Sequence, residues 1–448
     1  MVSIGKKASG GGNVLRRIAV LLLVLSSLPG SALAALCVDA PQAVALTDDL
    51  GRELVSGPDI EDVFAVRPNA LYAAGPRGAY RLYDGSGRQI GDIVFEMIDD
   101  NADALVFRRG GLYGAMDAAG ALLIAPVWTQ LTSDGRGGWL ALDGDPLSEQ
   151  PNALLHLDAS GAAQATNVRL LGGLSEVSCG RMPFMASGGL WGATNAEGSV
   201  AIEPVWVFLG PFRDGYARAW STRGAGLVDV DGRVAIEPVY DWLEQGPGYV
   251  AALNEKGLTV FSQDGSRRLF TVPGAGLEVG LAGSRLWVSN GKGVRLFDAN
   301  GTVLDSGAPG TTYSAGSLGQ TIACDGEWGE KCQRLLGSDG AVASARLQQI
   351  LPVCDGRYAW LEMDGIEYYS TELDRVQRSW DYSNLRYGLM DASGKPLTAA
   401  IYREIRPLSA NRMLMLTDDA AILADMNGRA LRTWHSAEGT EASAEAAG

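Results

Sequence analysis

Few side chains in this sequence have the spacing or surroundings that catalysis requires. Its 448 residues include only two histidines. His156 stands in an apolar run, and His435 comes just before a C-terminal stretch of small and acidic residues. A serine or cysteine nucleophile needs a histidine that an acid holds in place, and neither histidine has such a setting. The glycine patterns that cradle phosphates are also missing. We therefore predict no catalytic residue and no cofactor.

Two glutamates occupy equivalent positions, each directly before a proline in matching segments. They are Glu203 and Glu237. A pair of carboxylates can cleave glycosidic bonds, and their separation then decides the stereochemical outcome. Here the repetition of the surrounding sequence accounts for both, and Ala125 and Ala399 take their place in other segments. We expect these glutamates on a solvent-exposed face.

A third candidate is the acidic turn Asp229-Val230-Asp231-Gly232, which resembles the beginning of a calcium loop. It lacks the further ligands and the closing glutamate that such a loop supplies. Asp-Gly turns form without a metal, because the aspartate side chain bonds its own backbone and glycine accepts a positive φ. We predict no metal site.

Five cysteines offer redox chemistry. They are Cys37, Cys179, Cys324, Cys332 and Cys354. In an exported protein cysteines can oxidise, and Cys324 and Cys332 are close enough in sequence for a local disulfide. Cys179 and Cys354 occupy similar places in their surroundings, each just before a Gly-Arg step. An odd number leaves one free thiol or an intermolecular bridge.

The N-terminal residues have the order of a secretory signal peptide. Four basic residues come first, Lys6, Lys7, Arg16 and Arg17. The apolar run Ile18–Leu28 follows, and Ala32-Leu33-Ala34 forms a small-residue cleavage site. A membrane anchor is the alternative, but the run is shorter than the roughly 20 residues that span a bilayer. We predict cleavage after Ala34, a periplasmic or secreted location and no integral membrane insertion.

Composition excludes two classes of partner. Hydrophobic content of 46% with 20% charged residues is typical of a globular chain. Removing residues 1–34 takes four of the 37 basic residues and no acidic one, which leaves 33 against 52. Nucleic acid and anionic lipid attract the opposite charge. We predict no nucleic-acid partner.

The same turn recurs along almost the whole chain. Its glycines are Gly51, Gly87, Gly120, Gly161, Gly198, Gly232, Gly265, Gly301, Gly340, Gly394 and Gly428. They are 33 to 54 residues apart, and most follow an aspartate by one or three positions. A fixed period of this size indicates a repeat architecture.

Each turn lies between short strands. After Gly232, apolar residues alternate with others from Val234 to Tyr240, which predicts a β-hairpin. Pro204 and Pro238 cannot donate to a ladder, so we expect them at a strand end or in an edge strand. The stretch Thr371–Tyr382 departs from the pattern and fits a short helix or an extra hairpin.

The fold class that follows is all-β. We expect tandem repeats of ~34–40 residues, each made of short antiparallel strands. Propellers usually have four to eight blades, so ten or eleven repeats would need two propellers or an open array. We expect propeller-like packing, with an internal boundary near 245–255, and an open β-solenoid is the alternative.

The best units resemble the WG repeat of bacterial proteins. That signature joins an aromatic-Gly pair, an Asp turn with Gly, and an apolar strand that ends in Pro and an aromatic residue. Trp191-Gly192 with Gly198 and Ile202–Trp206 matches it throughout, whereas Tyr387-Gly388 matches only its first half. The resemblance is good over 110–245 and 385–402. It implies a repeated β architecture and an interaction role, and it carries no catalytic residues.

Aromatic residues recur at fixed positions of these repeats. They are Tyr113, Trp128, Trp191, Trp206, Tyr240, Tyr387 and Tyr402. Aromatic faces could bind sugars or peptide side chains, but recurrence in every unit is what packing between neighbouring repeats requires. We expect them to pack.

These patterns divide the chain into four parts. Residues 1–34 form the signal peptide, 35–250 the WG-type repeats, 251–435 more degenerate repeats and 436–448 a disordered tail. The expected function is a non-catalytic, protein-binding scaffold in the cell envelope, with an envelope or extracellular protein as partner. The alternative is a carbohydrate-binding or polysaccharide-related protein, which would gather aromatic residues and carboxylates in one cleft.

Overall fold

The computed structural model describes residues 35–41, 43–101, 104–326, 331–361, 365–370, 375–380 and 384–435. Within these ranges the regular elements are β-strands, which confirms the all-β fold class. No helix in the described part of the chain is long and apolar enough to span a membrane. The predicted signal peptide, 1–34, and the predicted tail, 436–448, lie outside these ranges.

Six sheets have four antiparallel strands in sequence order. They are β4–β7 (Asp62–Arg67, Leu71–Gly75, Tyr80–Asp84, Gln89–Phe95), β8–β11 (Met97–Asn101, Ala104–Arg109, Leu112–Met116, Leu122–Trp128), β19–β22 (Phe208–Leu209, Tyr216–Ser221, Gly224–Asp229, Val234–Tyr240), β23–β26 (Trp242–Gly246, Tyr249–Asn254, Gly257–Ser262, Arg268–Pro273), β27–β30 (Glu278–Ala282, Arg285–Ser289, Val294–Phe297, Val303–Gly307) and β39–β42 (Glu404–Ser409, Arg412–Leu416, Ala420–Asp425, Ala430–His435).

The remaining strands form one long sheet and four shorter ones. They are β12–β18 (Gln130–Ser133, Trp139–Leu142, Asn152–Leu157, Ala163–Leu171, Met182–Ala186, Trp191–Thr194, Val200–Trp206), β1–β3 (Leu36–Ala40, Ala43–Thr47, Glu53–Val55), β31–β33 (Thr312–Ala315, Thr321–Cys324, Gln333–Leu336), β34, β35 and β38 (Gln349–Cys354, Arg357–Leu361, Tyr387–Asp391), and the hairpin β36–β37 (Gly365–Ser370, Arg375–Trp380). Of the two structures expected for Thr371–Tyr382, the extra hairpin is the one formed over its described residues.

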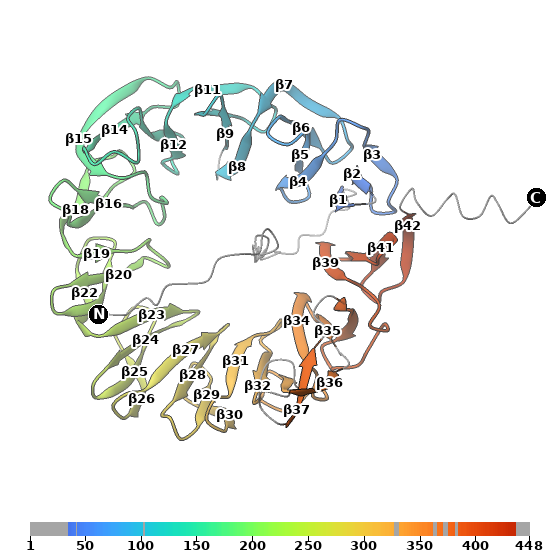
Figure 1. Cartoon of the computed structure of the whole chain (residues 1–448). Coiled ribbons are helices and arrows are strands. Elements are labelled where there is room, and N and C mark those ends of the chain that lie inside the picture. Colours follow the sequence, from blue (N-terminus) through green and yellow to red (C-terminus); the bar gives the residue numbers. More distant parts are fainter. Residues whose placement is uncertain are drawn as a thin grey trace, which may run out of the picture. The chain divides into compact units, whose positions relative to one another are not determined.

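Successive sheets pack face to face around a circle (Figure 1). Each interface is a small apolar core shared by two neighbouring sheets; for example, Leu227 of β21 and Val250 of β24 lie in the same cluster. The last sheet packs on the first in the same way, through Leu414 and Leu416 of β40 against Val38 of β1. The described chain therefore forms one closed circle of sheets. Propeller-like packing is confirmed, but the described residues form a single circle and not the two propellers that the number of repeats suggested. The boundary proposed near residue 250 falls inside β24 and remains a prediction based on repeat quality.

The recurring turn has the geometry that its residues predict. In the turn after β21, Asp229 Oδ1 accepts hydrogen bonds from the N–H groups of Asp231 and Arg233, both at 2.9 Å. The N–H of Gly232 donates to the Asp229 carbonyl at 2.9 Å. All eleven marker glycines have a φ between 71° and 90°, a region that L side chains rarely adopt. The turn prediction is confirmed.

The aromatic-Gly pair and the later proline belong to one β-bulge. Trp191 is paired with Trp206, and two residues further Ala193 is paired with Ile202, so β18 has extra residues against β17. At the bulge, the backbone of β18 passes very close to Gly192 of β17. A Cβ on Gly192 would lie 2.4 Å from the Ile202 carbonyl oxygen and 2.9 Å from the nitrogen of Pro204. Glycine is therefore required here. Pro204 lies in the outermost strand of its sheet, as predicted for a residue without a donor.

Each complete sheet has two different ends, because its strands alternate in direction. The turns from first to second and from third to fourth strand lie at one end, which includes Asp229–Gly232; we call it the turn end. The turn from second to third strand and the link to the next sheet lie at the other. Trp191 and Trp206 mark this aromatic end at the start of β17 and the end of β18.

Candidate functional site

The structure brings together the one pair of cysteines that the sequence singled out. Cys324 at the end of β32 and Cys332 before β33 have Cα atoms 4.9 Å apart and sulfurs 2.17 Å apart. The described cysteines outside this pair are Cys37, Cys179 and Cys354. Burial raises the pKa of the Cys37 thiol to about 12 and that of Cys354 to about 11. Since the thiolate is the nucleophile, neither thiol is activated at neutral pH.

The histidines take structural positions. His156 Nε2 lies 3.1 Å from Oδ2 of the buried Asp134. The other oxygen of Asp134 accepts the N–H groups of Arg136 and Gly138, so this aspartate caps the turn between β12 and β13. His435 ends β42 and is exposed. The two histidines therefore belong to different sheets, His156 to β12–β18 and His435 to β39–β42.

The acidic candidates lie in different strands and turns, and two of them pair with arginine. Glu203 and Glu237 are exposed, in β18 and β22 respectively, and Glu237 lies 3.6 Å from Arg223. Asp231 pairs with Arg233 at 2.5 Å within its own turn. Over the residues that the structure describes, no three His, Cys, Asp or Glu side chains gather in a way that could hold a metal ion.

The repeated aromatic residues pack, as expected. The first and last aromatics of a unit are cross-strand partners: Tyr113 with Trp128, and Trp191 with Trp206. Trp206 is only 9% exposed. All but one of the seven belong to, or pack against, the cores between sheets. The exception is Tyr387, whose hydroxyl donates to Gln349 at 3.2 Å.

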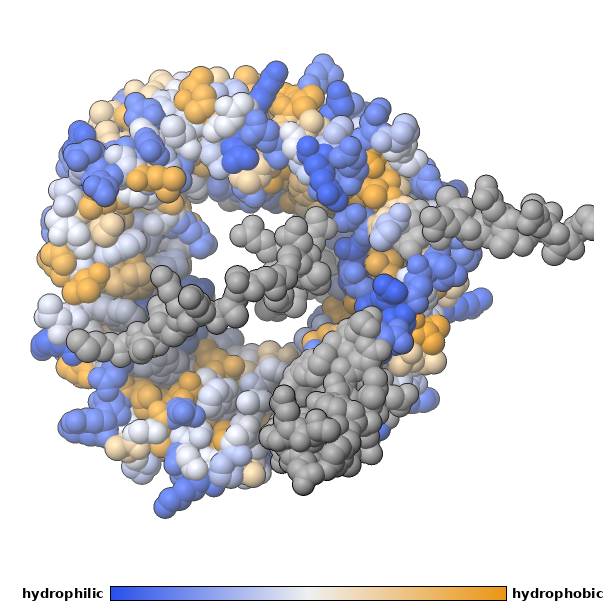
Figure 2. Space-filling model, viewed as in Figure 1, coloured by the Kyte–Doolittle hydropathy of each residue, from blue (hydrophilic) through white to orange (hydrophobic). Residues whose placement is uncertain are grey.

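A different set of apolar side chains is exposed at the aromatic end. We call it the apolar surface, and it consists of Leu190, Val205, Val207, Trp220 and Val239. Their exposed fractions run from 40% for Leu190 to 64% for Val205. In the same order, they lie in the turn before β17, at the end of β18, in the link from β18 to β19, at the end of β20 and at the end of β22. Apolar residues reach the surface at several places in Figure 2, so apolarity alone does not distinguish this set.

A row of aromatic rings distinguishes it. Trp191 and Phe208 have ring centroids 5.6 Å apart, and Phe208 and Trp220 are also 5.6 Å apart. The row passes from β17 to the sheet β19–β22, and its last ring, Trp220, is 44% exposed. Tilted aromatic contacts at this distance add stability beyond burial alone. The row therefore holds Trp220 in a fixed, partly exposed position beside Val207, whose N–H donates to the Trp220 carbonyl at 2.8 Å.

Alternation along the strand places the valines. In β18, Ile202 and Trp206 point into the core, so Val205 points to solvent. Val239 has the equivalent position in β22, directly before Tyr240. The same position is valine in the sheet β8–β11, where Val127 precedes Trp128 and is 57% exposed. An exposed valine before the last aromatic is therefore shared by three of these repeats.

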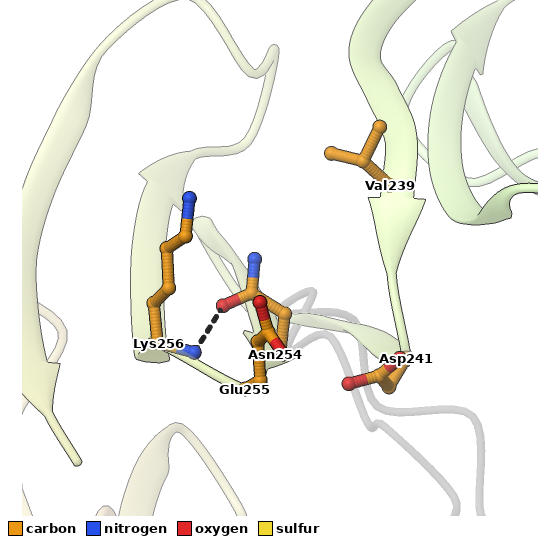
Figure 3. A pocket seen from close by; sticks show the side chains of 5 residues that line it. All are labelled: Val239, Asp241, Asn254, Glu255 and Lys256. Carbon is orange, nitrogen blue, oxygen red and sulfur yellow. Dashed lines mark hydrogen bonds between the residues drawn. The ribbon is translucent and has the colours of Figure 1, made fainter. Parts of the chain in front are cut away.

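Beside Val239 the surface contains a small pocket. Val239, Asp241, Asn254, Glu255 and Lys256 line it, with a volume of about 290 Å³ (Figure 3). It lies between the link from β22 to β23 and the turn from β24 to β25, where Asn254 Oδ1 accepts the Lys256 N–H at 3.0 Å. None of the five lining residues is aromatic. A sugar cleft of the kind considered above needs aromatic residues and carboxylates together, and this pocket has only the carboxylates.

The turn end has side chains of another kind, which sequence reasoning missed. Three arginines at the beginning of second strands donate from Nε to a neighbouring sheet. Arg181 reaches the carbonyl of Val230 at 2.7 Å, Arg357 that of Met426 at 2.5 Å, and Arg412 that of Asp49 at 2.7 Å. Each of these carbonyls belongs to the residue after a turn aspartate. The signal in the sequence is a Gly-Arg or Asn-Arg step after the first strand.

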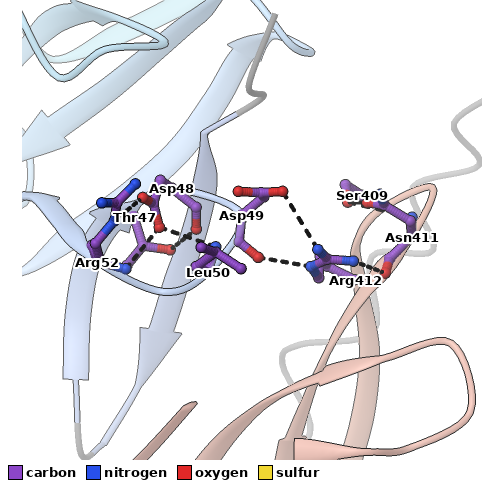
Figure 4. A network of polar contacts seen from close by, with 8 residues as sticks. All are labelled: Thr47, Asp48, Asp49, Leu50, Arg52, Ser409, Asn411 and Arg412. Atoms are coloured by element: carbon purple, nitrogen blue, oxygen red, sulfur yellow. Dashed lines mark hydrogen bonds and ion pairs between the residues drawn. The ribbon is translucent and has the colours of Figure 1, made fainter. Parts of the chain in front are cut away.

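The contact of Arg412 is one of several that join the last sheet to the first (Figure 4). Asp49 accepts it within a turn that Asp48 organises, with Asp48 Oδ1 bonded to the N–H groups of Leu50 and Arg52. The turn end thus connects sheets through main-chain carbonyls. Exposed apolar side chains occur at this end as well, for example Leu50 and Val234.

Comparison with solved structures gives distant similarities. BamB from Moraxella catarrhalis has 17% identity and a TM-score of 0.30, covering 61% of this chain and 92% of that one. A eukaryotic initiation factor has 11% identity and a TM-score of 0.42, covering 82% and 96%. The WD40 β-propeller domain of Doa1 has 17% identity and a TM-score of 0.23, covering 53% and 92%. None of the curated proteins matches the chain.

One family model matches, the one described as "WG containing repeat", over residues 191–219. This segment runs from the tryptophan that begins β17 to the middle of β20. It therefore includes Gly192, the bulge at Pro204 and the first two rings of the aromatic row. The chain contains a WG repeat, at residues 191–219.

Proposed function

We propose that this protein is a non-catalytic scaffold that binds another protein in the cell envelope through its apolar surface. The observation that supports the proposal is a set of exposed apolar side chains at the aromatic end of two neighbouring sheets, together with the row of aromatic rings that ends at Trp220. The set consists of Leu190, Val205, Val207, Trp220 and Val239. Contiguous apolar patches on a soluble protein mark interaction sites. Tryptophan held in a fixed position is typical of residues that contribute most of the binding energy at protein interfaces.

The charges around this surface suit a protein partner. Glu203 and Asp241 are exposed, and Arg223 lies close to Glu237 at 3.6 Å. Apolar side chains surrounded by charged groups form the usual core and rim of a protein interface. Carbohydrate binding is the alternative function, supported by the exposed face of Trp220, on which a sugar ring could stack.

The proposed location is the periplasm or the outside of the cell. The predicted signal peptide, 1–34, supports it. The geometry of Cys324 and Cys332 also supports it, since disulfides persist in oxidising compartments. We expect the exported protein to carry this disulfide, and mass spectrometry of a non-reduced digest would detect the linked peptides. Their absence from protein purified from the periplasm would contradict it.

The experiment compares mature 35–448 with the double variant Val205→Ser, Trp220→Ala in affinity capture from envelope extract. A matched control is Val342→Ser, which changes an equally exposed valine beside β33, outside the apolar surface. We expect one envelope protein to be enriched by the mature chain and the control, and its recovery to fall at least ~10-fold with the double variant. The same three proteins are applied to a glycan array.

The outcomes separate the two functions. Equal recovery by all three proteins would contradict binding through the apolar surface. Array binding that the double variant abolishes, without enrichment of any protein, would replace the scaffold function with carbohydrate binding.

A further inference from the structure

Over the described residues, the first sheet has one strand fewer than its repeat pattern calls for. The turn at Asp48 lies between β2 and β3, as the equivalent turn at Asp229 lies between β21 and β22, the third and fourth strands of their sheet. By this correspondence β1, β2 and β3 are the second, third and fourth strands. Among the described residues β1 pairs with β2 alone. The place of the first strand is beside the other edge of β1.

This edge has main-chain groups that do not take part in the ladder to β2. Ala40 is paired with Ala43 across the two-residue connection, and Val38 with Ala45. Because hydrogen-bonded pairs alternate along an antiparallel ladder, the N–H and C=O groups of Cys37 and Asp39 point away from β2. The Asp39 carbonyl accepts a hydrogen bond from Arg406 Nη2, which agrees with this orientation.

Arg406 itself has an unused donor at the edge. Its Nε is buried and has no hydrogen-bond acceptor among the described residues. Glu404 Oε1 lies 3.5 Å away, as an ion pair without hydrogen-bond geometry. A buried N–H of a charged group is costly to leave unpaired. An oxygen supplied beside β1 would satisfy it.

The surroundings of the edge are apolar on both faces of the sheet. On one face Val38 and Ala40 pack with Leu408 of β39. On the other, Cys37 packs with Val63 of β4. The edge therefore combines free main-chain donors with apolar walls, which is the arrangement that binds extended peptides by strand addition.

We propose that the edge of β1 accepts an extended segment of a partner protein as the missing first strand. The proposal rests on the proposed function and specifies how a protein partner is held. β1 has five residues, so the segment is about five residues long, without proline at its pairing positions, and rich in β-branched side chains. Its carbonyl groups face the N–H groups of Cys37 and Asp39.

The chain's own ends are less suited to this place. Predicted cleavage after Ala34 leaves a single residue before β1. Residues 436–448 consist of Ser, Ala, Glu, Gly and Thr, and most of these residue types are depleted in strands.

The test uses mature 35–448 and a capped, fluorescent peptide of sequence Thr-Val-Thr-Val-Thr, with binding followed by fluorescence polarisation. The variant Asp39→Pro removes the outward N–H and keeps the carbonyl that Arg406 contacts. Asp39→Ala is the matched control, since it removes the same carboxylate and retains the N–H. We expect the mature chain and Asp39→Ala to bind alike and Asp39→Pro to bind at least ~10-fold more weakly. Equal melting temperatures of the two variants exclude unfolding as the cause.

Three results would overturn the proposal. The first is that the mature chain does not bind the peptide, and the second is that Asp39→Pro binds it as well as the mature chain does. The third is that the amides of Cys37 and Asp39 are already protected from hydrogen exchange before peptide is added. The last result would mean that the chain fills its own edge. The variant Trp220→Ala separates this proposal from the proposed function. If it lowers partner capture while the peptide fails to bind, strand addition is wrong and the scaffold function stands.

Discussion

The two ends of each sheet are stabilised in different ways, by hydrogen bonds at the turn end and by packed rings at the aromatic end. At the turn end, Asp229 and Gly232 bond their own backbone, and arginines such as Arg412 bond the carbonyls of the next sheet. At the aromatic end, paired rings such as Trp191 and Trp206 pack in the core. The residues beside them, such as Val205, are left exposed.

This difference shows how a repeat protein can keep its architecture and still acquire a binding surface. Contacts to main-chain carbonyls do not depend on which side chain the neighbouring sheet carries. The exposed positions of the aromatic end contribute little to packing, so their side chains can be chosen for a partner. The predictions below test whether stability and binding divide between the ends in this way.

The largest effect is expected for Gly192→Ala. The new Cβ would lie 2.4 Å from a backbone oxygen, so the bulge must open, at a cost of about 2–3 kcal/mol. Thermal unfolding followed by circular dichroism measures the change. Gly188→Ala is the control, because a Cβ there meets no atom within 4 Å. Equal melting temperatures for both variants would show that the bulge does not depend on glycine.

Removal of the contact between the last and first sheets comes next. Arg412→Ala deletes the hydrogen bond to the Asp49 carbonyl, and hydrogen bonds of charged groups contribute about 1.5–3 kcal/mol. We expect a lower melting temperature and faster hydrogen exchange in β1–β3 and β39–β42. Arg429→Ala changes an exposed arginine of the same sheet and should leave both unchanged. Faster exchange elsewhere in the molecule, with these two sheets unaffected, would contradict a local role.

Acid should loosen the turn end first. The hydroxyls of Ser262 and Ser266 lower the pKa of Asp264 to about 2, and the Ser393 hydroxyl lowers the pKa of Asp391. A carboxyl whose pKa is lower in the folded state stabilises the fold above its unfolded pKa of about 4, and this contribution disappears as the pH falls towards 2. Melting temperature measured from pH 7 to 2 should fall within that window. Asp264→Asn should make the fall smaller, and an unchanged profile would remove this carboxylate from the explanation.

The smallest effect on stability is expected at the apolar surface. Val205→Ser exchanges a side chain that is 64% exposed, so the free energy of unfolding should change by no more than ~0.5 kcal/mol. Denaturant titration measures it. A loss several times larger would mean that Val205 serves the core and that the two ends are not specialised as described.

The sequence predicts those features that lie within one repeat. The turn at Gly232 depends on residues four positions apart, and Cys324 and Cys332 are eight apart. Both follow from local chemistry. The alternation around Ile202 and Trp206 also predicts the correct buried face.

The features that connect repeats could not be predicted in the same way. Arg412 and Asp49 are 363 positions apart, and nothing near either residue specifies the other. Phe208 and Trp220 lie outside the recurring aromatic positions, so their part in the aromatic row depends on how two sheets pack. Whether the circle closes, and which valines stay exposed, are likewise decided by neighbours distant in the chain.

The contact that closes the circle has a consequence for how such a protein can grow. Arg412 bonds Asp49 as Arg357 bonds Met426 and Arg181 bonds Val230, so the seam repeats a contact found inside the circle. In the part of the chain that the structure describes, the first and last sheets share no strand. A gene duplication that adds one unit would therefore create only an interface of a kind already present. The number of repeats can therefore change by whole units, provided that the angle between neighbouring sheets changes so that the circle still closes.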